Sequence, residues 1–248
     1  MRGHLVSDIR LHIAVGADCL SDSMAGRVIA IDGPAASGKS SVSRGVASSL
    51  DWLFVSSGHF YRTIAWGAVR DGVSSDDLAT WISLRHLALL SDGEDQDDKD
   101  NDGDTTRNVS LLLDGENATP HLSEPEVAAT VSVIATVPAV RDFINARLRA
   151  LADHHDLVME GRDIGSVVFP ETPWKFYLDA SPEVRARRRA SEGAIDSVSE
   201  RDRIDSTRAT APLIIPDGSI VIDTTHLDLQ QVIATVLSHL GTLTSSAQ

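Results

Sequence analysis

The sequence predicts an α/β protein in which helices cover both faces of a five-stranded parallel sheet. One observation is that short apolar runs alternate with longer segments whose apolar residues recur at helical spacing. A second is that the polar signatures of the chain follow the ends of those runs, at 33–40, 56–62, 160–165, 179–189 and 223–226. Because the carboxyl ends of parallel strands meet at one edge of a sheet, we expect these segments to share one cleft.

In the first half of the chain, two strands frame the first helix. The strands are expected at 28–31 and 52–55, and the helix at 40–50, where apolar residues fall on one face. A second helix is expected to follow the sequence SSGHFYR at 56–62. We also predict a helix over 74–90, because its apolar residues recur every three to four positions. These residues are Leu78, Trp81, Ile82 and Leu89.

The second half of the chain continues the alternation. An apolar run ending in Asp114-Gly115 predicts a strand over 109–113. Ser123 followed by Glu126 is typical of a capping box, so we expect Ser123 to cap a helix over 125–135. The remaining strands are expected at 157–159, 174–178 and 219–223. The remaining helices are expected at 138–151, 181–191, 197–210 and 227–240.

The spacing from Gly33 is the strongest motif: a glycine, four residues, then Gly38, Lys39 and Ser40, which is the G-x-x-x-x-G-K-[ST] pattern. Glycine lets backbone N–H groups turn toward phosphate oxygens. Lys39 would contact the outer phosphates, and the Ser40 hydroxyl would bind Mg²⁺. The motif therefore predicts a bound nucleoside triphosphate, but it does not say what happens to the γ-phosphate.

Composition and charge narrow the class of protein. The chain has 248 residues, of which 42% are hydrophobic, and no apolar run approaches the roughly 18 residues of a membrane helix. The single cysteine, Cys19, excludes an internal disulfide, which fits a reducing compartment. We therefore expect a cytoplasmic protein without a membrane partner, and a monomer.

The acidity of the chain is concentrated in one segment. Residues 91–104 contain eight acids and one base, a charge of −7 and half of the net charge of −14. We interpret this segment as a solvated loop. Ca²⁺ binding is the alternative, although the Glu that closes a calcium loop at position 12 is absent. The modest acidity of the remainder argues against a nucleic-acid partner.

Arginine is abundant near the ends of the predicted strands. Nine arginines lie in or next to the strand-end segments: Arg62, Arg141, Arg162, Arg185, Arg187, Arg188, Arg189, Arg201 and Arg208. Guanidinium groups bind phosphate oxygens in pairs, so this set suits small polyanionic substrates. The alternative for RARRR at 185–189 is a solvated helix face, and the alternative for Asp163 and Asp205 is ion pairing with arginine.

These stretches together resemble the bacterial-type cytidylate kinases of the nucleoside monophosphate kinase group. The resemblance covers most of 28–240 and is carried by IAIDGPAASGKS, SSGHFYR, PAVR (138–141), GRDIGSVVFP (161–170), KFYLDAS (175–181), ERD (200–202), APL (211–213) and VIDTT (221–225). It implies the P-loop fold of these kinases, with a core at 26–75, 138–184 and 211–242. It also implies a monophosphate-binding insertion at 76–137 and a helical lid at 185–210. Residues 1–25 would be a dispensable extension and 243–248 a tail.

The resemblance implies phosphoryl transfer from ATP to CMP or dCMP, with Mg²⁺ as the cofactor bound through Ser40. The residues matching the ATP site are Gly33, Pro34, Ala35, Ala36, Ser37, Gly38, Lys39, Ser40 and Ser41. Those matching the acceptor site are Ser57, Tyr61, Arg62, Ser132, Arg141, Arg162, Asp163, Arg201, Asp205 and Arg208. Among these, Ser132, Arg141 and Asp163 would read cytosine, and Arg201 with Asp205 would contact the ribose region. Lys39, Arg162 and Arg208 would be catalytic.

The chain departs from the family's pattern at several positions. Ser56 and Glu160 stand where the family usually has Asp, and Ser123 stands where it usually has Arg. Ile204 and Ser206 replace common lid arginines. Two alternatives therefore stay open: a related small-molecule kinase with another acceptor such as UMP, and a nucleotide-binding regulatory module without turnover.

Overall fold

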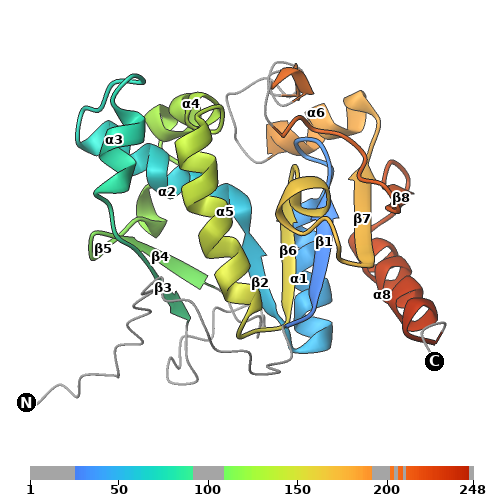
Figure 1. The fold of residues 1–248 in the computed structure, drawn as a ribbon. Coiled ribbons are helices and arrows are strands. Elements are labelled where there is room, and N and C mark those ends of the chain that lie inside the picture. Colours follow the sequence, from blue (N-terminus) through green and yellow to red (C-terminus); the bar gives the residue numbers. More distant parts are fainter. Residues whose placement is uncertain (1–25, 92–108, 192–201, 204–205, 209–210, 246–248) are drawn as a thin grey trace, which may run out of the picture.

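The computed structural model describes residues 26–91, 109–191, 202–203, 206–208 and 211–245, and its centre is a five-stranded parallel sheet (Figure 1). The strand order is β2-β6-β1-β7-β8. The strands are β1 (Val28–Asp32), β2 (Leu53–Ser56), β6 (Leu157–Gly161), β7 (Trp174–Asp179) and β8 (Ile220–Asp223). β1 therefore lies between two strands that follow it by more than a hundred residues.

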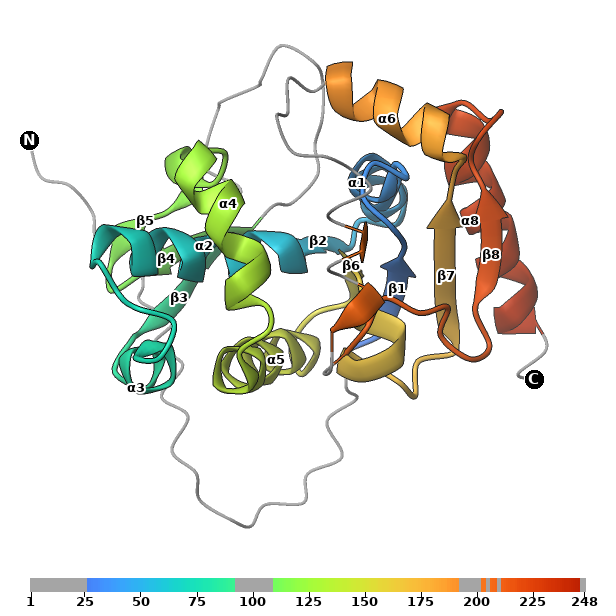
Figure 2. The same cartoon turned by 90° about the horizontal axis from the view of Figure 1, so that it is seen from above.

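Helices cover both faces of this sheet, so the predicted fold class is confirmed. Alternate residues of β1 point to opposite faces. Ile29 and Ile31 pack against α1 (Lys39–Leu50) and α8 (Leu229–Ser245), whereas Val28 and Ala30 face the core formed with other helices. Those other helices are α2 (Ser57–Arg70) and α5 (Pro138–Ala152). Seen from above, α1 and α5 lie on opposite sides of the sheet (Figure 2).

A second, antiparallel sheet lies beyond α2 in the order β3-β4-β5. Its strands are β3 (Leu87–Ser91), β4 (Val109–Leu113) and β5 (Glu116–Asn117), and α3 (Leu78–Ser83) and α4 (Pro125–Ile134) belong to the same region. The helix predicted over 74–90 is therefore confirmed only over Leu78–Ser83 and is wrong at its end. The apolar run at its end pairs with β4 instead, with Leu87 opposite Leu113 and Leu89 opposite Leu111.

The predicted capping box is also wrong. The N-cap of α4 is Glu124, and no side chain makes a capping hydrogen bond. Pro125 explains the shift, because a proline disfavours the helical region for the residue before it. Glu124 is extended, with φ −60° and ψ 141°, and Pro125 opens the first turn. Ser123 therefore lies one residue too early to cap the helix.

The predicted end of the last helix changes, and several predictions lie outside the described residues. α6 (Pro182–Ser191) matches the predicted helix, whereas α8 runs to Ser245, beyond the predicted end at residue 240. The predictions for 1–25, for the acidic segment after Ser91, for most of 197–210, and for Arg201 and Asp205 lie outside the described residues. No single helix among the residues described is long and apolar enough to cross a membrane. The bent pair α4–α5 passes that test only by length and composition.

Candidate active site

A cavity of about 850 Å³ opens at the carboxyl ends of β1, β2 and β6. Its lining comes from the phosphate-binding loop, α1, α2, α4, α5 and the segment after β6. Fourteen of the predicted site residues line it: Ala35, Ala36, Gly38, Lys39, Ser40, Ser41, Ser57, Tyr61, Arg62, Ser132, Arg141, Arg162, Asp163 and Arg208. The cavity therefore joins the predicted donor and acceptor residues in one cleft.

Gly33, Pro34 and Ser37 do not line the cleft and are buried beneath it. Gly33 is required here by close approach, since a Cβ atom would lie 2.1 Å from the carbonyl oxygen of Leu178. Gly38 is required by its backbone, because its φ of 94° lies in the left-handed region. The loop thus turns sharply into α1, whose N-terminus is favourable for an anion.

The phosphate-binding loop is stabilised by hydrogen bonds from its own Lys39 and from arginines of α6. Lys39 is buried, and its Nζ donates to the carbonyl oxygen of Pro34 at 2.8 Å. Arg188 donates to the carbonyl oxygens of Ser37 at 3.3 Å and Thr224 at 2.9 Å. Arg185 donates to that of Ala35 at 3.3 Å. Part of RARRR therefore contacts the loop, and the solvated-face interpretation fits only the exposed remainder.

Asp202, which follows residues 192–201 in the sequence, also contacts the phosphate-binding loop. Its carboxylate accepts the backbone N–H of Ala35 at 3.1 Å and pairs with Arg185. Arg189 on α6 lines the cleft itself. The segments on both sides of residues 192–201 therefore reach the phosphate-binding loop.

A buried ion pair forms the acceptor side of the cleft. Arg141 on α5 is 2% exposed and donates to Asp163, which is 4% exposed. Arg141 also donates to the carbonyl oxygen of Ala135 at 3.1 Å. The guanidinium carbon lies 5.6 Å from the centre of the Tyr61 ring. The ion-pair interpretation of Asp163 is therefore confirmed, and the same side chain also lines the cleft.

The other predicted arginines lie along the same wall. Arg62 donates to the carbonyl oxygen of Leu122 at 2.7 Å, and Arg162 to that of Gly33 at 2.8 Å. Arg208 lines the cavity, as does Ser132 on α4. Positive charge therefore surrounds the space between the loop and the buried ion pair, which suits phosphate groups.

The two family departures at strand ends contact each other. Ser56 and Glu160 are opposite residues of β2 and β6, and the Ser56 hydroxyl donates to Glu160 Oε1 at 2.5 Å. Burial alone would raise the pKa of Glu160, but Lys39, Ser56 and the nearby cations outweigh it and hold that pKa below its usual range. Glu160 is thus a carboxylate at the cleft beside Lys39. Sequence reasoning did not include it among the site residues, although its place at a strand end was a signal.

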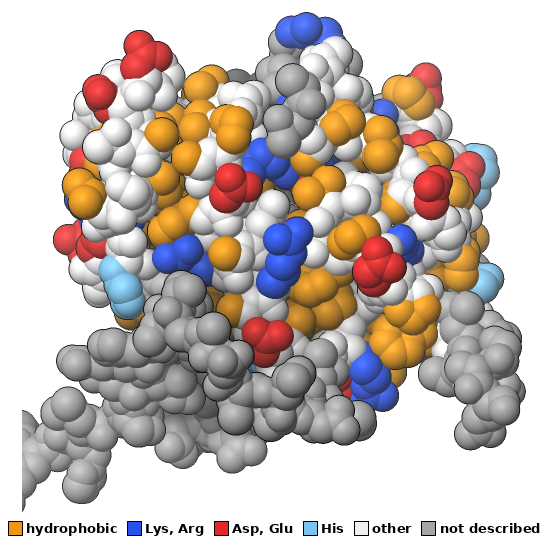
Figure 3. Space-filling view, viewed as in Figure 1, with side chains coloured by type: hydrophobic (Ala, Val, Ile, Leu, Met, Phe, Trp, Pro, Cys, Tyr) orange, Lys and Arg blue, Asp and Glu red, His pale blue; other side chains and the backbone are white. Residues whose placement is uncertain are grey.

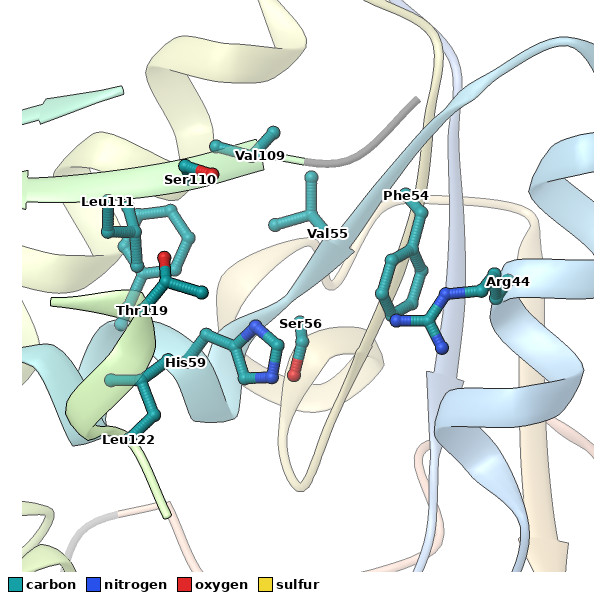
Figure 4. Close-up of a pocket in the computed structure, with 11 residues that line it drawn as sticks. Arg44, Phe54, Val55, Ser56, His59, Val109, Ser110, Leu111, Thr119 and Leu122 are labelled. Carbon is teal, nitrogen blue, oxygen red and sulfur yellow. The ribbon is translucent and has the colours of Figure 1, made fainter. Parts of the chain in front are cut away.

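His59 is a second residue that the predictions missed. It lines the main cleft and also a smaller cavity of about 260 Å³ between β2, α2 and β4. Figure 4 shows its imidazole beside the Ser56 side chain, with Arg44 across from them over Phe54. Burial, together with Arg62 and Arg44, lowers the pKa of His59 despite the nearby Glu160. The imidazole thus tends toward its neutral form in a cleft rich in arginine.

Asp32, the last residue of β1, is the third missed residue. It is 1% exposed and accepts the backbone N–H groups of Ile164 at 2.8 Å and Gly165 at 2.7 Å. Burial raises the pKa of Asp32 to about 7, with Asp163 adding to the effect, while the two amides and Lys39 oppose it. No motif assigns it a role, and its partners follow it by more than 130 residues.

The described residues contain no group of three His, Cys, Asp or Glu side chains that could hold a metal by themselves. The oxygen donors next to the loop are the exposed hydroxyl of Ser40 and the carboxylate of Glu160, both of which line the cleft. Mg²⁺ prefers such oxygen ligands and usually completes its shell with phosphate and water. These residues therefore fit a magnesium ion that arrives with a nucleotide.

Comparison with known proteins agrees with this geometry. A sequence model of the family "Cytidylate kinase" matches residues 29–242. A cytidylate kinase of Pelotomaculum thermopropionicum is 39% identical over 224 residues, which span 86% of this chain and 95% of that protein. A cytidylate kinase of Bdellovibrio bacteriovorus is also 39% identical, over 221 residues, 86% of this chain and 97% of that protein. With the motif, the cleft and these matches in agreement, the chain belongs to the cytidylate kinase family.

Proposed function

We propose that the protein transfers the γ-phosphoryl group of ATP to CMP or dCMP, giving ADP and CDP or dCDP. One observation carries the proposal: the phosphate-binding loop and the buried Arg141–Asp163 pair line the same cleft. The names of the relatives point to the same acceptor. A pure nucleotide binder has no need of a second polar site lined by arginine.

The donor half of the cleft suits ATP. The backbone of residues 33–41 and the N-terminus of α1 would bind the phosphates, with Lys39 turning from Pro34 to the outer phosphate oxygens. Ser40 and Glu160 are the residues that would hold Mg²⁺. When bound, Mg²⁺ supplies neutralisation of the charge on the β- and γ-phosphate oxygens.

The acceptor half suits cytosine. Asp163 would accept a hydrogen bond from the exocyclic amino group, and Arg141 would donate to the base carbonyl, with Ser132 on the adjacent helix wall. Uracil carries a carbonyl where cytosine carries the amino group, so it would place an oxygen against the Asp163 carboxylate. A site built for a hydrogen bond rejects an analogue that leaves its buried groups unpaired.

Arginines would align the reacting phosphates. Arg62, Arg162 and Arg208, with Ser57 and Tyr61, would bind the acceptor phosphate near the loop. An anionic oxygen of that phosphate attacks the γ-phosphorus while the bond to the β–γ bridging oxygen breaks, and ADP leaves. The attacking oxygen is already ionised, so the step depends on positioning and charge neutralisation rather than on a general base.

The division into parts also belongs to the proposal. The region 76–137 would serve the acceptor, and the lid at 185–210, with Arg201 and Asp205 on the ribose side, would exclude water that competes as an acceptor. On the face shown in Figure 3, basic side chains of the described residues are interspersed with acidic ones, which suits a small substrate better than nucleic acid. A monomer in the cytoplasm stays a prediction.

An assay of ADP release tests the proposal. ATP is supplied with CMP, dCMP, UMP or AMP, and we expect turnover with CMP or dCMP well above that with UMP or AMP. Lys39→Ala is the control and should abolish turnover. Preference for UMP would support a drifted acceptor site. ATP binding without turnover of any acceptor would support a regulatory module instead.

A further inference from the structure

Three hydrogen bonds tie the donor loop to the acceptor segment. Asp32 accepts the N–H groups of Ile164 and Gly165, and Arg162 donates to the carbonyl oxygen of Gly33. Asp32 and Gly33 lead into the phosphate-binding loop, while residues 162–165 contain Arg162 and the base-side Asp163. The two halves of the cleft are thus joined directly by hydrogen bonds at the end of β1.

The two N–H groups that Asp32 accepts belong to the start of the helical turn at 164–168, which provides no acceptor for them. Residues 164–168 form one wide helical turn, in which the N–H groups of Val167 and Val168 both reach the carbonyl oxygen of Asp163. The first N–H groups of a helical turn have no partner within it. Asp32 supplies both of its oxygens to them, one to each, so the carboxylate fixes the start of this turn.

The fit around Asp32 is tight. The carboxyl group is 1% exposed, and a Cβ atom on Gly165 would lie 3.3 Å from Asp32 Oδ2 and 3.3 Å from the Lys175 side chain. Asp163 directly precedes the held turn and faces the cleft with Arg141. A change in the Asp32 carboxylate is therefore transmitted to the residue that would read the base.

We propose that Asp32 is a positioning residue, whose carboxylate aligns Arg162 and Asp163 with the phosphate-binding loop. The inference rests on the proposed function, since it concerns how the donor and acceptor of that reaction are aligned. Asp32 itself does not line the cleft and would touch neither substrate. Small misplacements of bound groups cost large factors in rate, so a residue of this kind acts on kcat and on base discrimination.

Asp32→Asn is the direct test, because it keeps the shape but replaces one acceptor oxygen by an N–H donor. We expect kcat with ATP and CMP to fall about tenfold or more. The preference for CMP over UMP should fall about fivefold or more. The Kd of a non-hydrolysable ATP analogue should stay within about twofold, because the loop amides remain in place.

Asp156→Asn is the matched control. Asp156 joins the same two strands at their opposite ends, where its carboxylate accepts the backbone N–H of Arg27 at 2.7 Å. If Asp32 contributed only to stability, Asp32→Asn would resemble this control, with lowered stability but unchanged kcat and base preference. Gly165→Ala is the second variant, since its added methyl group presses on Asp32 without removing the carboxylate. We expect it to shift kcat and base preference in the same direction but less.

The outcomes separate the two proposals. A wild-type protein without CMP turnover would contradict the proposed function and this inference together. Normal CMP turnover in the wild type, with wild-type kcat and base preference in folded Asp32→Asn, would overturn only the role of Asp32. Should Asp32→Asn not fold, unchanged kcat and preference in Gly165→Ala would overturn it equally.

Discussion

The Arg141 and Asp163 side chains are buried in the protein core and also line the cleft. Both residues are nearly inaccessible, yet both line the cleft, so the pair is held by the core and still faces a ligand. Breaking such a pair is costly, because it leaves an uncompensated charge in a medium of low polarity. The proposed role of the pair in base recognition and its contribution to stability therefore cannot be changed independently.

Asp163→Ala should mainly weaken the preference for CMP over UMP. It removes the proposed acceptor for the cytosine amino group and leaves Arg141 without its partner, so stability should also fall by about 3 kcal/mol or more. Acceptor kinetics with CMP and UMP, measured well below the lowered melting temperature, check this expectation. Discrimination unchanged from the wild type would contradict the placement of Asp163 at the base.

Ser56 and Glu160 show how two departures can be linked. The family's usual pair of aspartates is replaced by a longer carboxylate and a hydroxyl that bonds to it at 2.5 Å. The hydroxyl fixes which way the carboxylate points, and partners of this kind tune metal affinity.

Ser56→Ala should therefore raise the Mg²⁺ concentration needed for half-maximal activity by about tenfold. Titration of Mg²⁺ at fixed ATP measures it. Ser49→Ala removes an exposed hydroxyl on α1 that bonds only within its own helix, and it serves as the control. Equal magnesium dependence in both variants would show that the Ser56–Glu160 bond does not act on the metal.

Asp32 should give stability an unusual pH dependence. Its folded pKa of about 7 lies above the ordinary value of 3.8, so the folded state keeps the proton that the unfolded chain releases. The contribution of this group to the free energy of unfolding should fall as pH rises from about 4 to 7, and then level off. Urea unfolding at several pH values measures it against Asp32→Asn, which should lack this decline. Parallel pH curves for the two proteins would contradict the raised pKa.

At the scale of elements, α2 packs so closely against the second sheet that a glycine in this helix has no room for a side chain. Replacing glycine by alanine inside a helix usually stabilises by up to about 1 kcal/mol. At Gly67 in α2, however, a Cβ atom would lie 2.1 Å from Leu113 Cδ2 and 3.0 Å from the Trp81 ring. Leu113 is fully buried in β4, so it has little room to move.

Gly67→Ala should consequently lower the free energy of unfolding by about 1–3 kcal/mol. Gly241→Ala in α8 is the control, because within the described part of the chain no atom beyond its chain neighbours and its own helix backbone lies within 4 Å of its Cβ position. This change should be neutral or stabilising. Chemical denaturation of both variants gives the comparison. A stabilised Gly67→Ala protein would mean that β4 shifts away from α2 at little cost.

Elements were predictable where local pattern and tertiary pairing agree. The five parallel strands and the helices α1, α5 and α6 follow from apolar runs and helical periodicity. The segment 74–90 was predictable only in part. Its first half forms α3, but its end pairs with β4, a strand that begins 18 residues after β3 ends. The start of α4 depended on a backbone restriction from Pro125 that outweighs the hydroxyl of Ser123.

At the scale of the whole molecule, the cleft was predictable because all parallel strands end at one edge. That rule brings Lys39, Arg62 and Asp163 together, because each follows the end of a parallel strand, whereas Arg141 reaches the cleft from α5. The rule that parallel strands end at one edge does not predict which side chains contact each other there. The Ser56–Glu160 bond depends on the register of β2 against β6, and the Asp32 contacts depend on a wide turn that has no sequence signature.

The central position of β1 also bears on how the chain is made. Its neighbours in the sheet are β6 and β7, and β2, the strand that follows it in sequence, lies on the far side of β6. A ribosome that has released 150 residues has therefore delivered only two strands of the parallel sheet, β1 and β2, which are not neighbours in it. The phosphate-binding loop leaves the exit tunnel before the rest of the cleft. The strand before it, β1, has no neighbouring strand to pair with until β6 and β7 follow. Pairing of β1 must wait until β6 and β7 have been synthesised, and chaperones that shield apolar strands have that interval in which to act.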